Sequence, residues 1–73
     1  MSISQKQLGI LKVLDAMPSG DMSYDDYYDE GYKDSRVLEA LETRGLITKG
    51  RYHFHITSLG RHTLTMLTPI HRL

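Results

Sequence analysis

The chain has 73 residues, with nine Lys or Arg, nine Asp or Glu and no cysteine. This length predicts a single domain over residues 1–73, and the lack of cysteine excludes disulfides, zinc–thiolate sites and cysteine nucleophiles. The net charge of zero argues against a general polyanion binder, yet residues 1–30 (six acids, two lysines) carry −4 and residues 31–73 (seven Lys or Arg, three acids) carry +4.

No uncharged stretch of the sequence approaches the roughly 20 apolar residues that a transmembrane helix needs. The N-terminal residues MSISQKQ lack the basic and then apolar pattern of a signal peptide. We therefore expect a cytoplasmic protein with no membrane partner, associated with the nucleoid if it binds DNA.

Residues 4–17 show the apolar periodicity of a core helix. Ser4 is a residue type that caps helix N-termini, and the run Pro18-Ser19-Gly20 ends the pattern. Apolar side chains recur at spacings of three and four residues: Leu8, Ile10, Leu11, Val13, Leu14 and Met17. The sequence therefore predicts a first helix over residues 4–17.

A second, acidic helix is predicted over about residues 23–30. Ser23 and Asp26 form a capping-box-like S-x-x-D start, and Gly31 supplies the stop. The last two acids fall at the negative end of the helix dipole, which disfavours them and indicates a role other than helix stability. We expect some of the nearby tyrosines to reach the core: Tyr24 and either Tyr27 or Tyr28.

A third helix is predicted over about residues 32–44. Val37, Leu38 and Leu41 give it one apolar face, and Gly45 supplies the C-terminal stop. Its N-terminal boundary stays open, because any of three residues can serve as the cap: Gly31, Asp34 or Ser35.

A β-hairpin and a fourth helix follow. Residues 46–48 and 51–57 are predicted strands on either side of Lys49-Gly50, a two-residue turn whose glycine takes a positive φ. Alternation puts three side chains on the core face: Tyr52, Phe54 and Ile56. A helix capped by Thr57 or Ser58 is then expected to run until Pro69, with residues 69–73 as a loose tail.

The order of these elements has a sequence signature. Leu41-Glu42, two residues, Gly45-Leu46-Ile47 and then Phe54-x-Ile56-Thr57-x-x-Gly60 resemble the L-E-x-x-G-L-I … Y-x-L-T-x-x-G pattern of winged helix-turn-helix DNA-binding regulators, including MarR-like and PadR-like repressors. The resemblance covers about residues 4–67. It implies a mainly α fold with a small β-hairpin, built from three helices, a two-stranded wing and a C-terminal helix.

The resemblance also implies a DNA-binding surface. In that family the N-terminal part of the third helix enters the major groove, and the basic tip of the wing touches phosphate or the minor groove. Matched positions that would face the bases are Tyr32, Lys33, Ser35, Arg36 and Glu39, with Lys49 and Arg51 at the wing tip. One departure is the second helix, because the five acids of residues 21–30 would be repelled by phosphate.

Other kinds of site have less support in the sequence. His53-x-His55 offers two metal ligands on one strand face without a third, and DMSYDDYYDE departs from a calcium loop at its glycine and closing glutamate positions. No grouping of serine, histidine and carboxylate suggests a nucleophile. We therefore expect no metal, no cofactor and no catalytic residues, and we do not expect an enzyme.

Two hypotheses for the function remain. The first is a sequence-specific transcriptional regulator of double-stranded DNA, a small repressor of the phage or mobile-element type that acts as a homodimer. The second is a winged-helix protein-interaction module that binds a basic partner, or imitates nucleic acid, through the acidic surface of its second helix: Asp25, Asp26, Tyr28 and Asp29.

Overall fold

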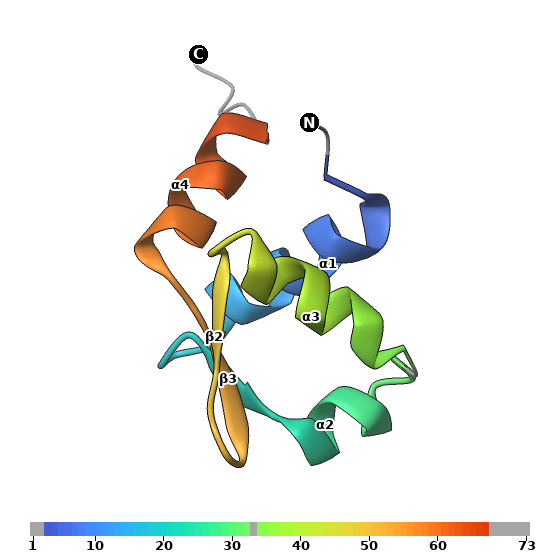
Figure 1. The fold of residues 1–73 in the computed structure, drawn as a ribbon. Helices are drawn as coiled ribbons and strands as arrows, with labels where there is room; N and C mark the ends of the chain where they lie inside the picture. The colour runs from blue at the N-terminus through green and yellow to red at the C-terminus, as the bar shows by residue number, and fades with distance from the viewer. Residues whose placement is uncertain (1–2, 33, 68–73) are drawn as a thin grey trace.

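The computed structural model describes residues 3–32 and 34–67, arranged as four helices and one three-stranded antiparallel sheet (Figure 1). The elements in chain order are α1 (Gln5–Ala16), β1 (Asp21–Ser23), α2 (Tyr24–Asp29), α3 (Ser35–Thr43), β2 (Ile47–Lys49), β3 (His53–Ile56) and α4 (Ser58–Leu67). The four predicted helices and the hairpin are confirmed. The predicted tail, residues 69–73, lies outside the described residues.

The first helix follows the predicted pattern closely. Ser4 caps α1, since its side chain accepts a hydrogen bond from the Gln7 amide at 3.1 Å. Its buried residues are Ile10, Leu11 and Leu14, which recur at the three- and four-residue spacing of one helix face. This face supplies one wall of the core.

The prediction of a two-stranded sheet was wrong, because Asp21–Ser23 forms a third strand. β1 pairs antiparallel with β3, with Met22 opposite Phe54, so β3 is the central strand in the order β1-β3-β2. A strand of three residues with one apolar side chain shows no alternation for sequence reasoning to detect. As a result, the hairpin is tied to the segment between α1 and α2.

The hairpin turn lies two residues later than predicted. Lys49 ends β2 and pairs with Phe54, while the Gly50 amide donates to the His53 carbonyl at 2.7 Å. The turn residues are therefore Arg51 and Tyr52. Gly50 does not have the positive φ that the sequence prediction assumed. Because it sits in the turn, Tyr52 is 69% exposed and does not join the core.

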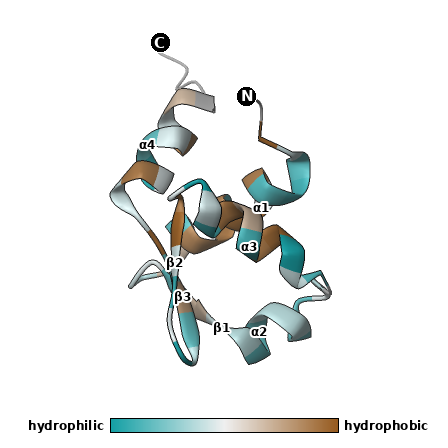
Figure 2. Ribbon diagram, viewed as in Figure 1, coloured by the Kyte–Doolittle hydropathy of each residue, from teal (hydrophilic) through white to brown (hydrophobic). Residues whose placement is uncertain are grey.

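The core lies where α1, α3 and the sheet meet, and Figure 2 shows hydrophobic stretches of these elements converging there. Among the largest fully buried side chains are Leu11, Leu14, Leu41 and Phe54, each from a predicted apolar face. The other buried hydrophobic residues are Ile10, Met22, Tyr27, Leu38, Leu46, Ile47, Ile56 and Leu64. The predicted apolar faces of α1, α3 and β3 thus pack together.

The end of α3 is closed by a glycine turn. Gly45 has a φ of 78°, its amide donates to the Glu42 carbonyl at 2.9 Å, and the Leu46 amide donates to the Leu41 carbonyl at 3.0 Å. This pair of bonds is the Schellman motif, which requires a residue that tolerates a left-handed conformation. The predicted glycine stop is confirmed, and it delivers the chain directly into β2.

Thr57 and Gly60 attach the start of α4 to this turn. The Thr57 hydroxyl donates to the Gly45 carbonyl at 2.7 Å and accepts from the Gly60 amide at 3.0 Å, while the Thr57 amide donates to the Leu46 carbonyl at 3.0 Å. Gly60 is buried, and a Cβ atom there would overlap the Leu46 carbonyl oxygen. The T-x-x-G part of the signature therefore has a direct packing reason.

We expect Gly60→Ala to destabilise the protein by about 1–3 kcal/mol, because the added methyl group must push the Leu46 backbone or the start of α4 out of place. Urea denaturation measures the free energy of unfolding. The matched control is Gly9→Ala in α1, where the added Cβ would have no atom within 4 Å apart from its chain neighbours and the helix's own backbone. That change should instead stabilise by up to about 1 kcal/mol through helix propensity. Equal effects of the two substitutions would contradict this packing.

Candidate nucleic-acid interface

The α2–α3 pair is defined by two caps. The Ser23 side chain accepts from the Asp26 amide at 3.1 Å and starts α2 as predicted. Asp34 caps α3, since its side chain accepts from the Arg36 amide at 2.9 Å. Among the three candidates for this cap the structure thus selects Asp34. Tyr32 consequently lies before the helix, and Lys33 lies outside the described residues.

Tyr27 connects α2 to both α3 and the sheet. Its side chain is buried, its hydroxyl donates to the Asp34 carbonyl at 2.9 Å, and its ring packs edge-on against Phe54 with centroids 5.6 Å apart. Burial raises the pKa of the Tyr27 phenol, with Asp34 adding to the effect, so the hydroxyl remains a donor. Of the two candidates Tyr27 and Tyr28, Tyr27 is therefore the one that reaches the core.

The neighbouring tyrosines take different positions. Tyr24 is partly buried against the core as expected, whereas Tyr28 is half-exposed. Tyr32 stacks on Tyr27 with ring centroids 4.9 Å apart, and it is partly buried. This contact places Tyr32 against the helix pair and not on the outward face of α3, where the prediction of a base contact had put it.

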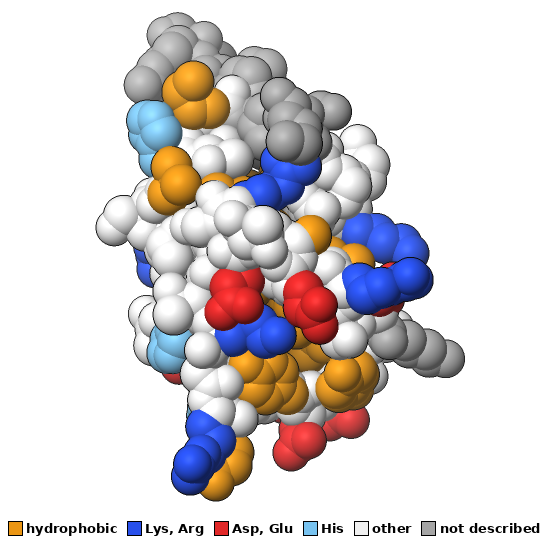
Figure 3. Space-filling view, in the orientation of Figure 1, with side chains coloured by type: hydrophobic (Ala, Val, Ile, Leu, Met, Phe, Trp, Pro, Cys, Tyr) orange, Lys and Arg blue, Asp and Glu red, His pale blue; other side chains and the backbone are white. Residues whose placement is uncertain are grey.

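The outward face of α3 carries the other predicted residues of the helix. Ser35, Arg36 and Glu39 are exposed, while Leu38 and Leu41 are buried on the opposite side. Figure 3 shows acidic and basic side chains close together on the face over α3. The surface that α3 offers is thus of mixed charge, with its polar side chains accessible from solvent.

Arg36 is not a free cation. Its Nε and Nη2 donate to the two carboxylate oxygens of Asp34 at 3.1 and 3.2 Å, although the Arg36 side chain is 85% exposed. The hydrogen bonds from the Arg36 side chain and backbone lower the pKa of Asp34 below its ordinary value, and Lys6 contributes to the same direction. The start of α3 therefore presents an arginine that is already oriented by an acid.

The tip of the hairpin carries one of the two predicted wing residues. Arg51 lies in the turn and is exposed, whereas Lys49 belongs to β2 and is partly buried. Figure 3 shows basic and hydrophobic side chains together at this tip. The sequence prediction placed the turn at Lys49-Gly50 and therefore assigned Tyr52 to the core face of the second strand. In the observed register Tyr52 lies in the turn beside Arg51.

Tyr24 connects the hairpin tip to α2. Its hydroxyl donates to the Gly50 carbonyl at 2.7 Å, its amide donates to the Tyr52 carbonyl at 3.1 Å, and its ring lies 5.6 Å from that of Phe54. Tyr27 makes the corresponding contact with the start of α3, through the Asp34 carbonyl. The hairpin tip and the start of α3 are therefore both attached to α2.

The acids of α2 form a separate feature. Asp25, Asp26 and Asp29 of the helix and Glu30 at its C-terminal cap are all exposed, and none of them pairs with a cation in residues 3–32 or 34–67. With the half-exposed Tyr28 they make up the surface that the second hypothesis uses. The structure brings the predicted residues Asp25, Asp26, Tyr28 and Asp29 together on one short helix.

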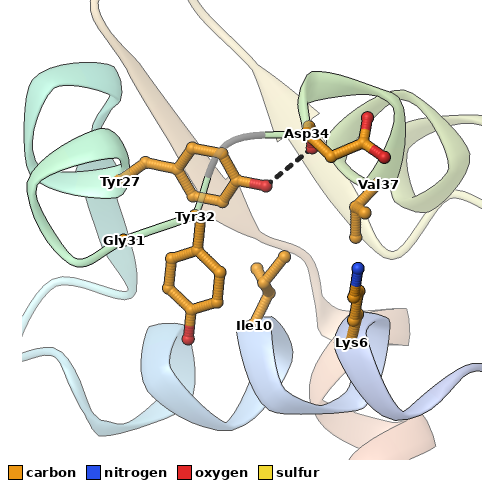
Figure 4. A pocket seen from close by; sticks show the side chains of 7 residues that line it. All are labelled: Lys6, Ile10, Tyr27, Gly31, Tyr32, Asp34 and Val37. Atoms are coloured by element: carbon orange, nitrogen blue, oxygen red, sulfur yellow. Dashed lines mark hydrogen bonds between the residues drawn. The ribbon is translucent and has the colours of Figure 1, made fainter.

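A pocket of 290 Å³ lies between α1 and the α2–α3 turn, and Figure 4 shows its walls. Its lining residues are Lys6, Ile10, Tyr27, Gly31, Tyr32, Asp34 and Val37. This volume is at the lower end of the range for small-molecule sites. No sequence pattern predicts the pocket, because its walls come from two separate stretches of the chain, residues 6–10 and 27–37.

His53 and His55 are both exposed on β3, and the Nδ1 atom of His55 lies 3.7 Å from a carboxylate oxygen of Asp21. Within the described part of the chain no group of three or more potential ligands is arranged to hold a metal ion. No described helix has the length and apolar character needed to cross a membrane.

No protein-family model, curated protein or solved structure matches the chain.

We expect the Asp34 carboxyl to titrate below its ordinary range in the folded protein, and Arg36→Ala to move its pKa upward. The carboxyl signal in an NMR pH titration measures this midpoint. Because the folded-state pKa is depressed, the stabilisation is present at neutral pH and is lost as the pH falls through that pKa. Arg51→Ala removes the same charge at the wing tip and should leave the midpoint in place. Equal shifts in both variants would contradict the local ion pair.

Proposed function

We propose that the protein is a sequence-specific DNA-binding transcriptional regulator of the winged-helix type. The observation that carries this proposal is that two exposed elements, the start of α3 and the hairpin tip, are both attached to α2. The N-terminal turn of α3 displays Ser35 and Arg36, and the tip of the β2–β3 hairpin displays Arg51. The element order, with the helix pair α2–α3 followed directly by a hairpin, agrees with the resemblance drawn from the sequence.

In this proposal the two elements have different tasks. Arg36 reads guanine through paired donors, Ser35 bonds to a base or phosphate, and Glu39 accepts from cytosine. Arg51 supplies an electrostatic contact with the DNA backbone or the edge of the minor groove. The sequence-based assignment of Lys49 to the tip is dropped, because Lys49 lies within β2 and is partly buried.

We further propose that the protein works as a homodimer of the small phage or mobile-element repressor type, since paired half-sites multiply the specificity of one short module. Leu59 and Met66 are 51% and 68% exposed and lie seven residues apart on α4, so they share one side of that helix. We expect sedimentation at micromolar concentration to give a dimer and Met66→Lys to shift it toward monomer. A wild-type monomer, both free and on DNA, would contradict this proposal.

A second candidate function is supported by the acids of α2. Their exposure without a described cationic partner suits a surface that binds a basic protein, and it works against close approach of phosphate to α2. Salt dependence separates the two candidates, because a DNA binder loses affinity for duplex as salt rises. A protein that binds no duplex at moderate salt would favour the interaction module.

The tasks assigned to Arg36 and Arg51 can be tested by substitution. Arg36→Ala should cost ~1–3 kcal/mol at the preferred duplex and relax preference at one base pair. Arg51→Ala should weaken all duplexes about equally and reduce the salt slope by about one unit. Fluorescence anisotropy with labelled duplexes at several salt concentrations measures both quantities.

The control for these two variants is Lys49→Ala, which removes the same charge from a partly buried site in β2. We expect its effect on affinity to be smaller than that of Arg51→Ala. Unchanged affinity and base preference in Arg36→Ala, on a protein that does bind DNA, would show that α3 does not read the bases.

A further inference from the structure

Asp34 and Arg36 form a connected unit at the start of α3. The Asp34 carboxylate is fixed to the backbone, because its Oδ1 atom accepts from the Arg36 amide at 2.9 Å. The Arg36 guanidinium then donates to the same carboxylate through Nε at 3.1 Å and Nη2 at 3.2 Å. Bidentate pairs of this kind fix the orientation of the guanidinium as well as its position.

This pairing leaves one edge of the guanidinium free. Arginine has five N–H donors, and Asp34 takes one from Nε and one from Nη2. Three donors remain, and two of them, one on Nη1 and one on Nη2, point in parallel from the terminal edge of the guanidinium. Bidentate recognition of guanine O6 and N7 requires two such parallel donors. Since the Arg36 side chain is 85% exposed, this edge is open to a ligand.

We propose that Asp34 is a positioning residue that determines base specificity by holding Arg36 in the orientation that reads guanine. The inference rests on the proposed DNA-binding function. An unrestrained arginine loses rotamer freedom when it binds, and the contact with Asp34 imposes part of that restriction before the DNA arrives. The arginine also offsets the negative charge of Asp34, which would otherwise face phosphate at the start of α3.

The positioning role and simple charge repulsion have opposite signatures. Removing the Asp34 charge relieves repulsion from phosphate and should raise the affinity for every duplex. Removing a positioning contact should lower the discrimination between the preferred duplex and one with the guanine replaced. The ratio of the two affinities therefore isolates positioning from electrostatics.

The test uses Asp34→Asn, because asparagine caps helices as well as aspartate does and α3 should remain intact. Dissociation constants are measured for the preferred duplex and for a duplex altered at the base pair where Arg36→Ala relaxes preference. We expect the discrimination ratio of Asp34→Asn to fall about 2- to 10-fold, the equivalent of ordering one rotamer-rich side chain. Its affinity for the altered duplex should rise.

The matched control is Glu42→Gln, which removes one negative charge from an exposed position on the same helix. It should raise both affinities alike and leave the ratio unchanged. A second control combines Asp34→Asn with Arg36→Ala, where Asp34 has no guanidinium to hold. In that background the Asp34 substitution should not alter the ratio.

Three results would overturn the inference. An unchanged ratio in Asp34→Asn would show that Arg36 needs no positioning, and an increased ratio would show that the ion pair holds Arg36 away from the base. In both cases the wild-type protein still discriminates between duplexes, and the proposed function stands. A wild-type protein that discriminates at no base pair overturns the proposed function and this inference together.

Discussion

The buried Tyr27 side chain is the contact on which the candidate interface depends. Its ring packs on Phe54 of the central strand β3, and its hydroxyl donates a hydrogen bond to the Asp34 carbonyl at 2.9 Å. Asp34 in turn caps α3 and pairs with Arg36. A continuous series of contacts therefore runs from the middle of the core to Arg36, the basic residue of α3.

Tyr24 provides the equivalent support for the wing, from the same short helix. It contacts Phe54 through its ring and the hairpin tip through its hydroxyl. The tyrosine that holds the start of α3 and the tyrosine that holds the hairpin tip therefore both pack on Phe54 of β3. The other side of α2 carries exposed acids. Helix α2 thus holds the hairpin tip and the start of α3 through two of its tyrosines, and it carries its carboxylates on another side. In the proposed function this arrangement keeps duplex close to α3 and the wing and away from α2.

Much of the helical part was predictable because its signals are local. Ser4, Ser23 and Gly45 act at the helix ends where their side-chain chemistry or backbone freedom indicated, and the apolar spacing of α1 and α3 matches their buried faces. The sheet was not predictable in the same way. β1 has only Met22 as an inward apolar residue, and its existence depends on pairing with β3 far along the chain. Local sequence does not contain that information.

The candidate site was predictable only in part for the same reason. Ser35, Arg36 and Glu39 follow from helix periodicity, and they lie outward as expected. The turn position depends on the register of β3 between two partner strands, which removes Lys49 from the tip, keeps Arg51 there and adds Tyr52. The Asp34–Arg36 pair and the Tyr32–Tyr27 stack depend on where α3 begins, which the sequence left open among three caps.

The measurement that tests the central claim most directly is an NMR titration of the isotope-labelled protein with duplex selected from a random library. It reports on both elements of the proposed surface and on the acidic helix in one experiment. We expect the largest changes in amide chemical shift at residues 35–39 and 50–53, with small changes at residues 25–30. The largest changes at residues 25–30, or no enrichment of any duplex by the wild-type protein, would contradict the account.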